Sequence, residues 1–74
     1  MNYPIPGDIH DELIRARAKF PEPFHSTHEG IAVIWEEFEE LKAEVFKQDC
    51  KLSDMYDEAI QLAAMAVRFI EDLL

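Results

Sequence analysis

The stretch DMYDEAIQLAAMAVRFIEDLL, residues 54–74, decides the fold of this 74-residue chain. It contains no proline or glycine, and alanine, leucine and methionine, which favour helices, recur along it. With helical residues about 100° apart, apolar side chains cover most of its circumference. A helix apolar over so wide an arc is surrounded by other elements, and two further helices of one chain would hardly cover it. The stretch therefore predicts a homo-oligomer, a dimer or a tetramer, most simply two helical hairpins joined as a four-helix bundle.

A second helix is expected before it, beginning at STHE, residues 26–29. Ser26 and Glu29 have the spacing of a capping box, in which the hydroxyl and the carboxylate satisfy the first turn. Six apolar residues then recur at helical spacing. They are Ile31, Ile34, Trp35, Phe38, Leu41 and Val45. A short polar connection follows, and Ser53 or Asp54 is expected to cap the last helix, which makes the two helices antiparallel neighbours.

A third, shorter helix is predicted near the N-terminus, over DIHDELIRARAKF, residues 8–20. Asp8 is its expected cap, and Pro21 ends it. It carries Arg15, Arg17 and Lys19, which are expected to form a solvated basic face or, as the alternative, to bind phosphate. The chain is thus expected to be one all-α domain over residues 1–74. Residues 1–24 form an N-terminal extension with a short helix, and residues 25–74 form a long helical hairpin.

Charge and composition limit the classes of function. Sixteen acidic against seven basic residues give a net charge of −9, which disfavours a DNA or RNA partner and suits divalent cations. No apolar run reaches the roughly 18 residues of a membrane span, and MNYPIPGDIHDE lacks the features of a secretory signal. With Cys50 as its one cysteine, the chain is expected to be cytoplasmic. A domain this small has a marginal core, so a metal or a partner chain is expected to stabilise it.

Glu58 is the anomalous residue of the last helix. It falls between Met65 and Phe69, inside the apolar arc, with Gln61 one turn away at the edge of that arc. An unpaired ionised carboxylate there is costly, so Glu58 must be paired, protonated or bound to a metal.

The preceding helix offers carboxylates to meet it. Glu37, Glu40 and Glu44 flank its apolar stripe on one side, whereas Glu36 and Glu39 point away. Carboxylates at i and i+3 on facing helices hold hard cations such as Mg²⁺ or Mn²⁺. The spacing therefore indicates that Glu37 and Glu40 face inward beside Glu58.

Two motifs in these helices resemble those of a known family. EEFEEL, residues 36–41, fits the E-E-x-x-E-L signature of the MazG-like all-α nucleoside triphosphate pyrophosphohydrolases, and EAIQ, residues 58–61, stands where that family carries E-x-x-D. The run HEGIAVIWEEFEELKAEV resembles short, often phage-encoded members, and the resemblance covers roughly residues 25–74. It implies that Glu37, Glu40 and Glu58 hold Mg²⁺ or Mn²⁺. It also implies that Glu37 and Glu40 take part in cleaving a (d)NTP to a monophosphate and pyrophosphate.

The sequence departs from the family at Gln61, which replaces the aspartate. Its carbonyl oxygen can bind a metal, but it brings no charge and cannot act as a base. In that family, basic and amide residues beyond the position of Leu74 grip the nucleotide, so Lys42, Arg68 or the basic first helix of a neighbouring subunit is expected to take their place. His28, near the end of the bundle, is a further candidate substrate contact.

Two functions stay open. The chain is either an active Mg²⁺-dependent pyrophosphohydrolase or a noncatalytic helical oligomer that acts as an interaction module. In the second case a side chain such as Lys42 or Arg68 would neutralise Glu58.

Overall fold

Three helices make up the part of the chain that the computed structural model describes, residues 3–74. Helix α1 spans Ile5–Lys19, α2 spans Thr27–Val45 and α3 spans Leu52–Leu73. No strand occurs within these residues. The all-α class and the order of a short helix followed by a long hairpin are therefore confirmed.

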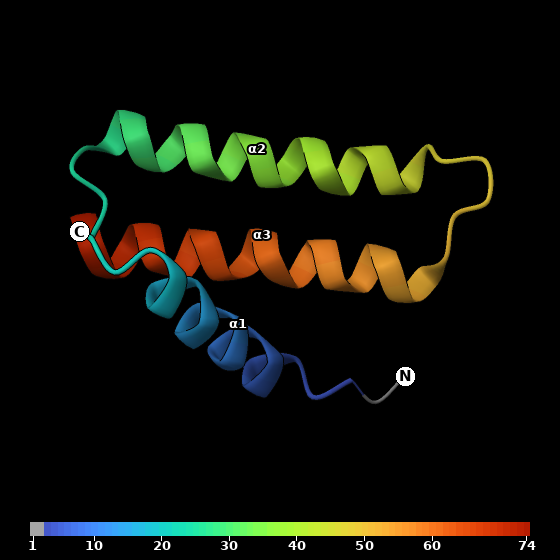
Figure 1. Ribbon diagram of the computed structural model, residues 1–74, viewed down its shortest axis with the longest axis horizontal. Helices are drawn as coiled ribbons and strands as arrows, with labels where there is room; N and C mark the ends of the chain where they lie inside the picture. Colours follow the sequence, from blue (N-terminus) through green and yellow to red (C-terminus); the bar gives the residue numbers. More distant parts are fainter. Residues whose placement is uncertain (1–2) are drawn as a thin grey trace.

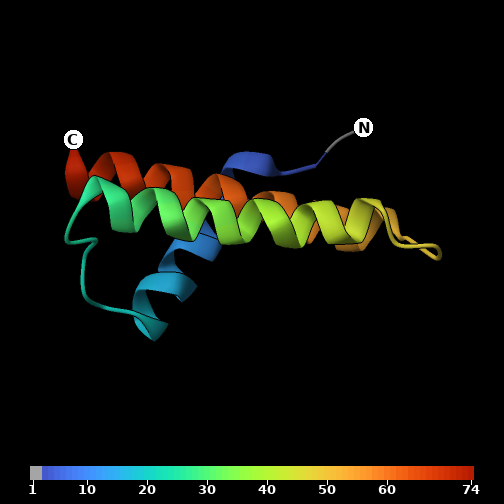
Figure 2. The same cartoon turned by 90° about the horizontal axis from the view of Figure 1, so that it is seen from above.

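Helix α3 is the element on which the other two pack. Helices α2 and α3 lie side by side and antiparallel, while α1 crosses α3 obliquely (Figures 1 and 2). Across residues 3–74, α1 and α2 each pack on α3 but not on one another. Consequently, α1 and α2 leave a space between them whose floor is α3. Within the same residues, no helix has the length and apolar character needed to cross a bilayer.

The start of α2 follows from its sequence. Ser26 is the N-cap, and its Oγ accepts a hydrogen bond from the backbone N–H of Glu29 at 3.0 Å. Glu29 Oε1 in turn accepts from the backbone N–H of His25 at 2.9 Å, so the carboxylate closes the turn one residue before the N-cap. The predicted start of this helix is confirmed.

The other two helices begin elsewhere than predicted. Helix α1 starts at Ile5, because proline is tolerated in a first turn, where backbone N–H groups have no partner within the helix. Helix α3 starts at Leu52, and Lys51 is its N-cap without any side-chain hydrogen bond. Caps at Asp8 and at Ser53 or Asp54 are therefore wrong. The carbonyl of Lys51 already accepts the N–H of Met55 at 3.1 Å, so the helix begins two or three residues earlier than predicted.

The core is small and centred on α3. Ala64 and Met65 are buried there, together with Leu13 of α1. Six further apolar side chains pack around these three. They are Ile9, Ala16, Phe24, Val33, Ile34 and Val67. On α2, a methyl group at Gly30 would lie 2.6 Å from Phe69 Cδ2, so the absence of a side chain there allows α2 to approach α3 closely.

A buried guanidinium fixes the connection between α1 and α2. Arg68 is only 3% exposed. It donates hydrogen bonds to the carbonyl oxygens of Phe20 at 2.6 Å and Glu22 at 2.7 Å, and to Asp72 Oδ2 at 3.3 Å. Asp72 Oδ2 also accepts the backbone N–H of Phe24 at 3.0 Å. These bonds hold residues 20–24 against the C-terminal half of α3.

Candidate metal centre

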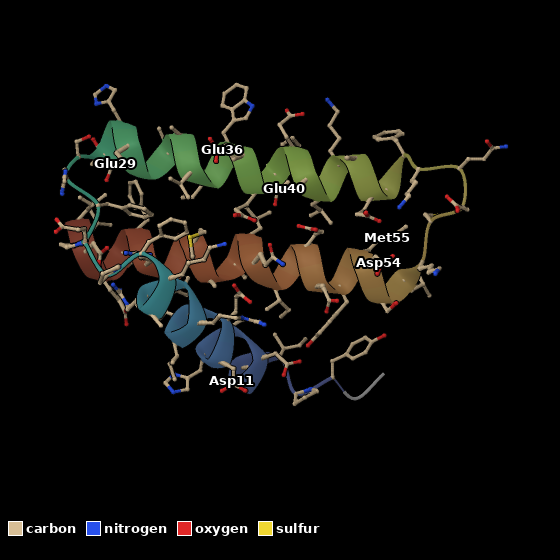
Figure 3. All side chains as sticks on the ribbon, in the orientation of Figure 1. Asp11, Glu29, Glu36, Glu40, Asp54 and Met55 are labelled. Atoms are coloured by element: carbon tan, nitrogen blue, oxygen red, sulfur yellow. The ribbon has the colours of Figure 1, made fainter. Side chains whose placement is uncertain are left out.

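Three carboxylates meet where α2 faces α3. One oxygen atom from each of Glu37, Glu40 and Glu58 lies within 4.8 Å of the others. We call these residues the carboxylate triad. Figure 3 shows Glu40 on the side of α2 that faces α3. The helical period alone predicted that these three residues would face one another, and the structure brings them together.

The triad contains oxygen atoms with unmet hydrogen-bonding capacity. Glu37 and Glu58 are half-buried and Glu40 is exposed. In each half-buried residue, Oε2 is shielded from solvent and has no hydrogen-bond partner among residues 3–74. Leaving a buried carboxylate oxygen without a partner is costly. A proton or a cation at this position would remove that cost.

The same burial raises the pKa values of Glu37 and Glu58. Burial, reinforced by the charges of Glu40 and Glu58, raises the pKa of Glu37 from 4.5 to about 7. Burial likewise raises the pKa of Glu58, with the neighbouring carboxylate of Glu40 adding to the shift. Two charges no more than 4.8 Å apart repel by at least about 1 kcal/mol in water and by at least about 3 kcal/mol at an effective dielectric constant of about 20. Near neutral pH, protons and a cation therefore compete for the carboxylates of the triad.

The chemistry of the donors fits a hard divalent cation. Carboxylate oxygens are preferred ligands of Mg²⁺ and Mn²⁺, and neither cation requires the thiolate or imidazole donors that favour zinc. Three carboxylates leave further coordination positions for water or substrate, and exposed Glu40 places the triad at the molecular surface.

Gln61 is half-buried and lines the space between α1 and α2. Its role as a ligand stays a prediction.

The expected substrate contacts are scattered. His28 is exposed in the first turn of α2. Lys42 is exposed, and its Nζ lies 3.7 Å from Glu39 Oε2. Arg68 lines the space between α1 and α2, but its N–H groups are directed at backbone carbonyls and at Asp72.

No basic side chain neutralises Glu58 among the ion pairs of residues 3–74. Lys42 pairs with Glu39, and Arg68 pairs with Asp72. The expectation that one of these two bases pairs with Glu58 is therefore wrong for the folded chain.

Two further carboxylates belong to the surroundings of the triad. Glu44 raises the pKa of Glu58, and its Oε2 is buried without a hydrogen-bond partner among the described residues. The helical period had placed it on the correct side of α2. Glu12 of α1 contributes to the raised pKa of Glu37. No pattern within residues 8–20 indicates how α1 crosses α3, so sequence reasoning had no signal for Glu12.

Comparisons of this chain with protein-family models, with curated proteins and with solved structures found no match. Assignment to the MazG-like family therefore stays a prediction from the two motifs, and the geometry of the triad is a separate observation.

The raised pKa of Glu37 predicts how stability depends on pH. The folded protein binds this proton more tightly than the unfolded chain does, because the pKa falls from about 7 to 4.5 on unfolding. The stabilisation is fully present below pH 4.5 and is lost as the pH rises through about 7. Urea denaturation in EDTA should therefore give a lower free energy of unfolding at about pH 8 than at about pH 5.

The matched variants are Glu37→Gln and Glu39→Gln. Glutamine at position 37 should reduce the loss between the two pH values, whereas exposed Glu39 should be replaceable without effect on it. An undiminished loss in Glu37→Gln would contradict the assignment of this titration to Glu37.

Proposed function

We propose that this chain is a nucleoside triphosphate pyrophosphohydrolase that uses Mg²⁺ or Mn²⁺ held by the carboxylate triad. The observation that carries the proposal is that α2 and α3 each direct a shielded, unpartnered carboxylate oxygen into the same site. A protein that needed only packing at this position would place apolar side chains there. The two MazG-like motifs fall on the same three residues, which supports this reaction class over other metal-dependent chemistry.

The reaction is hydrolysis between the α and β phosphates. Water oxygen attacks the α phosphorus, the bond to the bridging oxygen breaks, and pyrophosphate leaves. When bound, the cation would draw the phosphate oxygens together and lower the pKa of the attacking water. Glu37 and Glu58 supply ligands from opposite helices, and exposed Glu40 lies on the side open to substrate. Glu44 lies outside the triad but close enough to raise the pKa of Glu58. Its Oε1 pairs with Lys47 at 3.7 Å, and its unpartnered Oε2 is the atom suited to accept the water's proton.

Release of pyrophosphate tests this function. The wild-type protein, given Mg²⁺ and a panel of eight ribo- and deoxyribonucleoside triphosphates, should release pyrophosphate and a monophosphate from at least one of them. Glu58→Gln should reduce the rate more than the roughly 10–100-fold typical of changes in residues that merely orient metal ligands. Glu39→Gln is the matched control and should keep the wild-type rate. Full activity of Glu58→Gln, or no activity of the wild type on any nucleotide, would contradict the proposal.

A second candidate, a noncatalytic helical oligomer, is favoured by an exposed apolar face. On α2, Ile31, Trp35, Phe38 and Val45 are exposed at helical spacing, and Trp35 is 66% exposed. Ile70 of α3 and Leu74, the C-cap of this helix, are exposed as well. Monomers rarely expose large contiguous apolar patches. We therefore propose that two hairpins pair through this face as a four-helix bundle, whether or not the chain is an enzyme.

Sedimentation equilibrium tests the pairing. The wild type should sediment as a dimer, and Trp35→Glu should shift it to the monomer because dimerisation would bury the introduced charge. Ile14→Glu is the control, since Ile14 is a similarly exposed apolar residue on α1. A monomeric wild type, or a dimer unaffected by Trp35→Glu, would contradict the arrangement. A dimer without nucleotide hydrolysis would favour the noncatalytic function.

A further inference from the structure

A cleft of about 670 Å³ lies between α1 and α2. Its volume falls within the range of about 300–1,000 Å³ typical of small-molecule sites. Gln61, Met65 and Arg68 of α3 line it from below, and the segment that joins α1 to α2 closes one end. The cleft exists because α1 and α2 both pack on α3 without packing on each other.

Two basic residues of α1 border this cleft one helical turn apart. Arg15 has a side chain that is 74% exposed, and its ion-pair partner is Glu12 on the same helix. Lys19 forms no ion pair among residues 3–74, and its ammonium lies 5.4 Å from the centroid of the Phe20 ring. Glu12, whose side chain is 14% exposed, accepts from only part of the Arg15 guanidinium, so its remaining N–H donors can bind an incoming anion. Both cations are therefore available to a ligand.

The neighbouring bases hold the cleft in shape. Arg17 binds Glu71 at 2.9 Å and Asp72 at 3.0 Å, which ties the end of α1 to the end of α3. Arg68, buried on the floor, donates to the carbonyls of Phe20 and Glu22 and to Asp72. The N–H groups of these two guanidinium groups already donate to acceptors within the protein. Of the arginines and lysines that border the cleft, Arg15 and Lys19 are thus the two left for an anion.

The opposite wall of the cleft leads to the carboxylate triad. Glu37 belongs both to the triad and to the lining of the cleft. A ligand that fits this arrangement must offer anionic oxygens to α1 and a bound cation to α2. A polyphosphate complexed with a divalent cation has this distribution of charge. Phe24, Val33 and Met65 add apolar surface within the same cleft, which suits the sugar or base of a nucleotide.

We infer that Arg15 and Lys19 bind phosphate oxygens of a nucleoside triphosphate whose cation is held by the triad. The inference rests on the proposed function and extends it to α1. This helix lies outside the region that resembles the MazG-like family. It also provides anion contacts within the cleft, whose lining includes neither His28 nor Lys42.

Calorimetric titration with magnesium tripolyphosphate tests this site in the full chain. The wild type should bind it. Arg15→Ala and Lys19→Ala should each raise the Kd by about tenfold and the double variant by more, since each removes a charge-assisted contact. Lys51→Ala is the matched control and should leave the Kd unchanged, because Lys51 is exposed at the N-cap of α3, outside the cleft. Circular dichroism verifies that the double variant remains helical.

The outcomes separate this inference from the proposed function. An unchanged Kd in the double variant, or no binding of tripolyphosphate by the wild type, overturns the role of Arg15 and Lys19 even if the triad binds Mn²⁺. If the triad binds no Mn²⁺ but tripolyphosphate in EDTA still binds in a manner that requires both residues, the anion site stands and the proposed hydrolase does not.

Discussion

The packing of both α1 and α2 on α3 determines the shape of this small protein. Because α3 makes all the helix–helix packing among the described residues, its buried positions must satisfy two neighbours at once. Ala64 and Met65 do so with apolar contacts, and Arg68 does so with hydrogen bonds to the segment that joins α1 to α2. The cleft between α1 and α2 is a direct consequence, since only α3 fills the space beneath it.

Acidic residues occupy a position where packing alone would favour apolar ones. Glu37 and Glu58 face each other along the α2–α3 contact, with shielded oxygen atoms and raised pKa values. A small core has little stability to spare, so three converging carboxylates weaken the fold unless something positive binds them. A divalent cation would relieve the repulsion between the carboxylates and join the two long helices. The proposed function thus explains a feature that destabilises the fold.

The helical period predicted the long hairpin and the convergence of the triad, because it fixes the direction of every side chain around its helix axis. Helix boundaries were less predictable. Helix α3 begins without a side-chain cap, so Ser53 and Asp54 carried no decisive signal.

The placement of α1 lay beyond sequence reasoning. It depends on contacts such as Arg17 with Asp72, 55 positions apart, and no local pattern encodes that pairing. The structural role of Arg68 was hidden for a related reason. Nothing in the sequence distinguishes an arginine that is buried and donates to backbone carbonyls from one that binds a substrate. The oligomer and the catalytic activity stay predictions.

The central claim is that the two long helices share one divalent-cation site. Titration of Mn²⁺ into isotope-labelled protein, followed by paramagnetic broadening of backbone amide resonances, tests it most directly. The account predicts saturable broadening centred on residues 37–40 of α2 and 58–61 of α3, reversed by excess Mg²⁺. Broadening spread over exposed acidic residues such as Asp11 and Asp49, or none at all, would contradict it.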